Sequence, residues 1–206
     1  MKWSEHLIAR AVALQIFQRK HLVVVDNCNW TGHECDLLVV TSDLRIIDVE
    51  VKISRADFKA DAKKDKWWHR RFTGYGPVVE EHRDGRLVRM SQKPLYDETE
   101  RLWPPKVWKH YYALPKAIWK PEMVEFINPN SGILLLREGR ASMPVIVDVE
   151  RRVRANKDAE KITAAQAVDI ARLASLRMWA AYSDVARMRD DTARILAARQ
   201  PEEATA

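Results

Sequence analysis

The chain has 206 residues, of which 47% are hydrophobic and 31% are charged, a balance typical of a folded globular protein. No apolar run approaches the roughly 18 residues that a membrane-spanning helix needs, and the N-terminal residues lack the apolar core of a secretion signal. We therefore expect a cytoplasmic protein with no membrane partner. Its 35 lysines and arginines exceed its 29 acidic residues, and the net charge of +6 mildly favours a polyanionic partner.

The N-terminal third contains two predicted helices separated by three predicted strands. A helix is predicted over residues 4–19, where apolar residues recur on a helical period and Ser4 is a suitable N-cap. Three runs rich in Val, Ile and Leu, each bounded by polar turns, then predict short strands over residues 21–26, 35–41 and 45–54. A capping box that begins at Ser54 predicts a second helix, which ends at about Phe72.

For the remainder of the chain the sequence predicts an inserted hairpin, further strands and a long helix. Glycines and prolines break residues 73–105, and Asp84–Gly85 is a two-residue hairpin signal. Apolar runs predict strands over residues 110–114, 124–127, 132–136 and 145–149. Residues 163–199 contain no Gly or Pro, which predicts one long helix or two helices broken near Ser183. Its large apolar residues are expected to cover the core or a second subunit: Leu173, Leu176, Trp179, Val185, Met188 and Ile195.

Together these elements predict an α/β fold in which helices flank a mixed β-sheet. The sheet carries an inserted hairpin, and a long helix ends the chain. We divide the sequence into a domain over residues 1–155, which includes the insert at 73–105, and a C-terminal helical extension over residues 156–206.

A pattern of an acid, any residue and a lysine is the first candidate for chemistry. It occurs three times, at Glu50-Lys52, Asp57-Lys59 and Asp61-Lys63. The last two pairs fall in the predicted second helix, where residues two apart point in different directions. Glu50 and Lys52 fall in a predicted strand, whose period of two places both side chains on one face. Asp48 and Ile46 share this face, and the opposite face is apolar.

The predicted hairpin brings a second acid close to this pair. If residues 42–44 form the loop between two antiparallel strands, Asp36 lies directly opposite Glu50. Two carboxylates so close need a positive partner, and Mg²⁺ prefers such oxygen ligands. Lys52 would then lie near the attacking water or the scissile phosphate, and Glu5 could add a ligand or position a water. The arrangement predicts hydrolysis of phosphodiesters.

Each of these residues also has a simpler explanation. A solvated sheet face often carries a Lys–Glu pair, and an acid in the first turn of a helix, such as Glu5, complements the helix dipole. Asp48 is expected to be solvated, and Glu34 is an alternative acid for the face of Glu50. His33 and Cys35 could be two of four zinc ligands, but no second Cys/His pair completes a closed site.

A basic stretch follows the predicted catalytic strand and provides candidate DNA contacts. The seven basic residues between positions 55 and 71 are Arg55, Lys59, Lys63, Lys64, Lys66, Arg70 and Arg71. Trp67 and Trp68 interrupt the stretch, and we expect one to be core and the other to be free to stack on a base. An ordinary soluble helix face is the alternative. The insert, with its own arginines, could clasp DNA, form a dimer arm or take no part.

These residues also resemble a known family. Asp36, followed fourteen residues later by Glu50-Val51-Lys52 and preceded by a helical Glu5, resembles the PD-(D/E)XK nuclease superfamily. More narrowly, DVEVKISRADFKADAKKDKWW and HYYALPKAIW are similar to the core of MmcB-type DNA repair proteins, over roughly residues 4–72 and 107–138. The sequence departs from the family pattern at Cys35, where the superfamily is named for a proline. The insert and the C-terminal helix have no counterpart.

The resemblance implies a restriction-endonuclease-like sheet, a DNA substrate and a magnesium or manganese ion. It implies metal binding by Asp36, Glu50, Val51 and Glu5, and catalysis by Asp36, Glu50, Lys52 and Glu5. We therefore expect a Mg²⁺-dependent DNA endonuclease or exonuclease that acts in DNA repair, recombination or phage DNA processing, and a homodimer would suit a two-strand cut. The alternative is a non-catalytic DNA-binding subunit with a nuclease-like fold.

Overall fold

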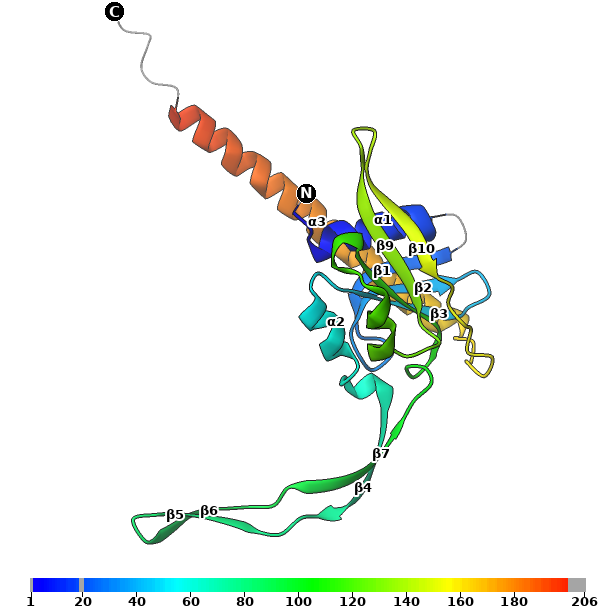
Figure 1. The fold of residues 1–206 in the computed structure, drawn as a ribbon. Helices are drawn as coiled ribbons and strands as arrows, with labels where there is room; N and C mark the ends of the chain where they lie inside the picture. The colour runs from blue at the N-terminus through cyan, green and yellow to red at the C-terminus, as the bar shows by residue number, and fades with distance from the viewer. Residues whose placement is uncertain (1, 19–20, 200–206) are drawn as a thin grey trace, which may run out of the picture.

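A six-stranded mixed β-sheet forms the centre of the computed structural model, which describes residues 2–18 and 21–199 (Figure 1). Its strands are β1 (His21–Cys28), β2 (Cys35–Thr41), β3 (Ile46–Val51), β8 (Val107–Pro115), β9 (Gly132–Arg140) and β10 (Met143–Arg151), in the order β1-β2-β3-β8-β9-β10. The β3–β8 and β8–β9 pairs are parallel and the other pairs are antiparallel. The predicted α/β class with a mixed sheet is confirmed.

Among the described residues, three α-helices accompany the sheet, and each of them begins at a capping side chain. They are α1 (Glu5–Ile16), α2 (Arg55–Asp61) and α3 (Ala164–Arg199). The hydroxyls of Ser4 and Ser54 accept hydrogen bonds from backbone amides three residues on, and Thr163 and Gln166 cap α3 reciprocally. The described residues also contain three short 3₁₀ helices, η1 (Asp65–Trp67), η2 (Lys116–Ile118) and η3 (Pro121–Phe126). No helix of the described residues has an apolar stretch long enough to cross a membrane.

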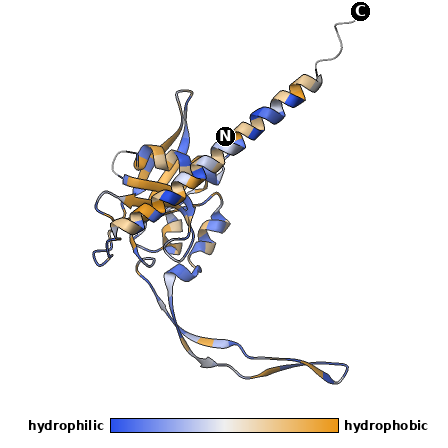
Figure 2. Cartoon of the chain, turned by 180° about the vertical axis from the view of Figure 1, so that it is seen from behind, coloured by the Kyte–Doolittle hydropathy of each residue, from blue (hydrophilic) through white to orange (hydrophobic). Residues whose placement is uncertain are grey.

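The sheet is buried on both faces, so the body has three layers. On one face, Ile8, Ala11 and Val12 of α1 pack against alternate residues of the central strands, among them Val49 and Val51. On the other face, the start of α3 covers β1, β2 and the first residue of β3 through Ala167 and Ile170. Phe58 of α2, Trp67 and η3 cover the adjoining part of that face over β8 and β9. The orange strands at the centre of Figure 2 show this apolar interior.

A long hairpin arm, residues 68–100, projects from the body (Figure 1). It consists of β4 (Trp68–Tyr75) paired with β7 (Pro94–Glu100), and of β5 (Val79–Arg83) paired with β6 (Arg86–Ser91). Asp84 (φ 52°) and Gly85 (φ 73°) form its tip. Both have the positive φ that the common type I′ two-residue hairpin turn needs. The predicted inserted hairpin is confirmed, and it begins earlier in the chain than expected.

Two predicted elements differ from the structure. The second helix ends at Asp61 rather than at Phe72, because Trp68–Phe72 pair with residues 96–100 in the arm. Residues 124–127 are not a strand: η3 begins at Pro121, a residue that suits the first position of a helix, and it buries Met123. In both cases contacts with distant or preceding residues outweigh the local apolar pattern.

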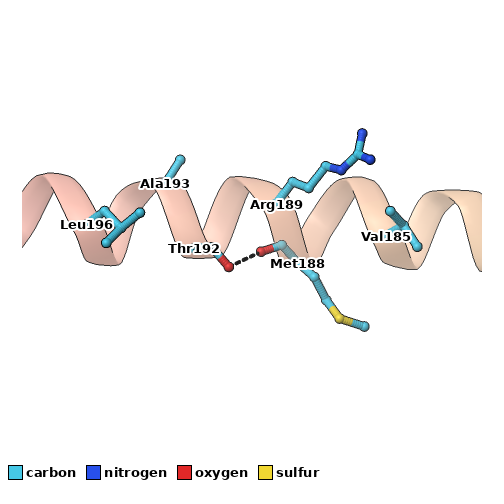
Figure 3. Close-up of a pocket in the computed structure, with 6 residues that line it drawn as sticks. All are labelled: Val185, Met188, Arg189, Thr192, Ala193 and Leu196. Atoms are coloured by element: carbon cyan, nitrogen blue, oxygen red, sulfur yellow. Dashed lines mark hydrogen bonds between the residues drawn. The ribbon is translucent and has the colours of Figure 1, made fainter. Parts of the chain in front are cut away.

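Helix α3 is continuous through Ser183, and most of its length extends beyond the body (Figure 1). The six apolar side chains that were predicted to cover the core or a second subunit are exposed, from Leu173 at 37% to Trp179 and Met188 at 62% exposure, so they do not cover the core. Figure 3 shows a shallow cavity lined by α3 alone: Val185, Met188, Arg189, Thr192, Ala193 and Leu196. There the Thr192 hydroxyl donates to the Met188 carbonyl at 2.7 Å. The expected homodimer stays a prediction.

Candidate functional site

The register of the β2–β3 hairpin is the predicted one and brings Asp36 to the end of the ladder. Leu37 pairs with Val49 and Val40 with Ile46. The ladder pairs begin at Leu37, the residue that follows Asp36. There the Asp36 carboxylate accepts a hydrogen bond from the Val51 backbone N–H at 2.6 Å. The Asp36 carboxylate is thus the hydrogen-bond acceptor for the Val51 N–H at the end of β3.

Three of the predicted metal-binding residues line one cavity. Glu5, Asp36 and Val51 surround a space of about 140 Å³ at the N-terminal end of α1, together with His6, Ala9, Asp26 and Asn27. Glu5 lies in the first turn of α1 and is exposed. The structure thus brings the first turn of α1 and the start of β2 to the same cavity. Glu50 does not line this cavity.

The surroundings of the Asp36 carboxyl group disfavour its negatively charged form. Burial, followed by the nearby Glu50 carboxylate, raises the pKa of Asp36 from 3.8 to about 6. The Val51 N–H, Lys52 and Lys64 act in the opposite direction but do not cancel the effect. A divalent cation bound by the cavity oxygens would relieve this repulsion, so the donor set fits Mg²⁺ or Mn²⁺.

Glu50 lies on the α2 face of β3, where three ammonium groups surround its carboxylate. Its Oε2 accepts from Lys52 Nζ at 2.7 Å and from Lys64 Nζ at 3.0 Å. Its Oε1 accepts from Lys66 Nζ at 2.5 Å. The side chains of Glu50, Lys52 and Lys66 are almost completely buried, whereas that of Lys64 is 47% exposed. Lysines thus supply the positive partner that the sequence requires beside Glu50.

Two further acids join this group, which we call the buried ion cluster: Asp48, Glu50, Lys52, Asp61 and Lys66. Asp61, at the end of α2, accepts from Tyr112 Oη at 2.6 Å and lies 3.2 Å from Lys52 Nζ. Burial alone would raise the pKa of Asp61, but Lys66 and Lys52 outweigh burial and hold the pKa well below its usual range. Asp61 follows the buried Phe58 by three residues, and that helical spacing was the available sequence signal.

Asp48 is fully buried, which contradicts the expectation of a solvated acid. Its Oδ2 lies 3.5 Å from His33 Nε2, 3.6 Å from Lys66 Nζ and 3.7 Å from His110 Nε2. Burial, and then the charge of Lys66, lowers the pKa of His110 to about 4, so this imidazole is neutral at pH 7. The side chains of His33, Lys66 and His110 lie against Asp48 and shield it from solvent.

The predicted DNA-contacting residues separate into two groups. Lys66 is buried in the ion cluster, so its ammonium is not available to a phosphate in this structure. The other six are exposed: Arg55, Lys59, Lys63, Lys64, Arg70 and Arg71. Trp67 is buried, and Trp68 is half-buried and donates to the Ala62 carbonyl at 3.2 Å. Arg70 and Arg71 lie on β4 of the arm rather than on a helix.

Comparisons with known proteins add little to this geometry. No protein-family model matches the chain, and no curated protein matches it either. A solved structure of a protein of unknown function from Silicibacter pomeroyi aligns with 100% of this chain and 98% of that chain, at 18% sequence identity and a TM-score of 0.45. A likeness at this level carries no argument about function. The resemblance to the PD-(D/E)XK nucleases therefore stays a prediction.

Proposed function

We propose that the protein is a metal-dependent deoxyribonuclease that hydrolyses phosphodiester bonds of DNA. The observation that carries the proposal is the convergence of Glu5, Asp36 and Val51 on one cavity at the end of β3, the strand that holds Glu50 and is followed by Lys52. These residues come from three separated parts of the chain. Such an assignment agrees with the cytoplasmic location and the nucleic-acid partner expected from the sequence.

In this proposal some residues would bind the cation, and others position the ammonium groups near the phosphate. The carboxylates of Asp36 and Glu5 would hold Mg²⁺ or Mn²⁺, with Glu50 on the neighbouring face of β3. When bound, the ion supplies positive charge for the phosphate and lowers the pKa of a coordinated water. Glu50 and Asp61 fix the Lys52 ammonium in position, at 2.7 Å and 3.2 Å. Lys64 is the half-exposed ammonium bound to Glu50, and a phosphate can reach it from solvent.

The experiment is a cleavage assay with linear, single-stranded, flapped and branched DNA in the presence of Mn²⁺. We expect cleavage by the wild type and a loss of about 10²-fold or more in Asp36→Asn and Lys52→Ala. Asp148→Asn is the matched control, because Asp148 is a half-exposed acid of β10 that pairs with Arg137 at 2.8 Å. Equal activity in wild type and Asp36→Asn, or no cleavage of any substrate, would overturn the proposal.

A second candidate function is a DNA-binding subunit without turnover, and one observation favours it. Three lysines already neutralise Glu50, so this acid needs no metal ion for its own stability. This candidate predicts salt-sensitive DNA binding without cleavage, because phosphate contacts release counterions. Calorimetric titration with Mn²⁺ separates the two candidates: the nuclease loses affinity in Asp36→Asn, whereas the binding subunit shows no specific uptake in either protein.

A further inference from the structure

A second set of metal-binding side chains lies beside the buried ion cluster. Single ligand atoms of His33, Cys35 and Asp48 all lie within 4.8 Å of one another. His33 belongs to the turn before β2, Cys35 is the first residue of β2, and Asp48 lies in β3. Gly32 adopts φ 99°, a conformation that favours glycine, and its N–H donates to the Asn29 carbonyl at 3.0 Å. This turn directs His33 back over the two strands.

An independent observation points to a cation at this position. Both carboxylate oxygens of Asp48 are buried, and neither has a hydrogen-bond partner among the described residues. Its contacts with His33, Lys66 and His110 are all 3.5 Å or longer. A buried carboxylate that lacks hydrogen bonds is unfavourable, because burial removes its hydration. A metal ion bound directly to Asp48 would replace that hydration.

The donor atoms define the class of metal. A thiolate sulfur, an imidazole nitrogen and a carboxylate oxygen form a set that suits Zn²⁺, whereas Mg²⁺ prefers oxygen alone. With the usual zinc bond lengths, two ligands of a tetrahedral ion lie about 3.4 Å apart. His33 Nε2 and Asp48 Oδ2 are already at 3.5 Å. Cys35 Sγ lies within 4.8 Å of a ligand atom of each of the other two residues.

His33 connects the three proposed ligands with solvent. Its side chain lines a cavity of about 440 Å³, together with Glu34 and residues 63–66. Three protein ligands leave one tetrahedral position vacant, and this cavity offers water or the Glu34 carboxylate for it. Cys35 and Asp48 are buried behind His33. The arrangement therefore combines a buried pair of ligands with one route for the ion.

We propose that His33, Cys35 and Asp48 form a binding site for Zn²⁺ or a divalent cation with similar ligand preferences. The site is distinct from the cavity of Glu5 and Asp36 and does not depend on nuclease activity. It shares Asp48 with Lys66, which also contacts Glu50. An ion at Asp48 would repel the Lys66 ammonium and leave it paired with Glu50 and Asp61. Zinc binding would thus alter the charge balance of the buried ion cluster.

Proton release provides a signature of this site. The Cys35 thiol must lose its proton to solvent before sulfur can bind the ion, so about one proton is released per ion. The affinity should consequently rise with pH. An oxygen-only site for Mg²⁺ would not titrate a thiol.

The experiment is a titration of the full chain with Co²⁺, after the protein has been stripped of metal and its cysteines have been kept reduced. Binding is measured by the sulfur-to-cobalt absorption band. Zn²⁺ is then added to compete with the bound Co²⁺. The wild type should bind one ion with sub-micromolar affinity, and Zn²⁺ should displace the cobalt. Cys35→Ser should abolish the band, and His33→Ala should weaken binding at least tenfold. His33 is at the surface, so its replacement provides a test even if Cys35→Ser folds poorly; circular dichroism checks both variants.

Two controls make the assignment specific. Cys28 is the other cysteine, is also buried, and lies opposite Cys35 in the β1–β2 ladder. Cys28→Ser should keep the band, and Glu50→Gln should keep the cysteine-dependent signal even if DNA cleavage is lost. Micromolar or weaker binding by the wild type would overturn the proposal. Unchanged binding in His33→Ala, or loss of the band in Cys28→Ser, would also overturn the assigned ligands.

Discussion

The charged side chains of the buried ion cluster are excluded from water, whereas those of the hairpin arm are exposed to it. In the cluster, each side chain is at most 2% exposed and is in contact with an opposite charge at 3.9 Å or less. In the arm, residues 68–100 carry six basic and six acidic residues, and pairs such as Arg70–Glu98 are exposed. Burial makes every pairing in the cluster necessary, whereas water can replace any pairing in the arm.

The largest expected effect comes from removing a single charge from the cluster. Lys66→Met leaves Asp48, Glu50 and Asp61 with one fewer buried cation, and we expect the free energy of unfolding to fall by about 3–5 kcal/mol. Arg70→Met is the matched change in the arm and should lower it by less than about 1 kcal/mol. Urea denaturation of both variants measures the difference. Similar small losses in the two variants would show that burial does not enforce the pairing.

A smaller effect on the free energy of unfolding is expected from Asp36, whose side chain is only partly buried. Its pKa is raised to about 6, so folding favours the protonated carboxyl group. The stability that this provides is present below about pH 4 and is lost as the pH rises towards 6. Because Asp36 is partly exposed, we expect Asp36→Asn to gain about 1–2 kcal/mol over the wild type across this window. Denaturation at pH 4, 5, 6 and 7 without metal is the measurement. A constant difference between the two proteins would contradict the raised pKa.

The third prediction compares the arm with α2 as surfaces for DNA. Lys59 and Lys63 are exposed beside the body, whereas the charges of the arm sum to zero. If both lysines contact phosphates, Lys59→Gln with Lys63→Gln should reduce the slope of log affinity against log salt by about 1.8. Arg83→Gln with Arg86→Gln, at the arm tip, should leave the slope unchanged. The reverse result would place the DNA on the arm.

The smallest effect is expected from shortening the arm. Replacing residues 79–91 with a two-residue turn removes β5 and β6, whose side chains are all exposed. The free energy of unfolding should change by less than about 1 kcal/mol, because no core contact is lost. Thermal denaturation of the full chain and the shortened chain tests this. A larger loss would mean that the arm supports the body.

Local sequence signals predicted the parts of the fold that depend on neighbouring residues. Ser4, Ser54 and Thr163 cap helices as expected, and the Asp84–Gly85 turn and the β2–β3 register are present. Strand β4 was not predicted, because its paired residues in β7 lie 19 to 32 positions away and residues 68–72 have no strong alternation of their own. Non-local pairing therefore decided the elements that the pattern left ambiguous.

The candidate site was predictable only in part for a similar reason. Alternation along β3 placed Glu50 and Lys52 on one face, and their contact at 2.7 Å agrees with it. The same pattern could not show that Lys64, Lys66 and Asp61 converge on these two residues, since all three lie outside β3, in α2, in η1 and at the N-cap of η1. Nor could it show that Asp36 turns towards α1 while Glu50 points to α2. The partners of a buried charge depend on which elements pack over it.

The bond between Asp36 and the Val51 N–H has a consequence for measurement. The carboxylate protects an amide at the end of a strand, where no ladder carbonyl is paired with it. A ligand that draws the Asp36 oxygens away would leave this amide open to solvent. Hydrogen–deuterium exchange at Val51 would then quicken on ligand binding, while neighbouring amides inside the ladder keep their rates. A single backbone position could thus report occupancy of the cavity without any assay of turnover.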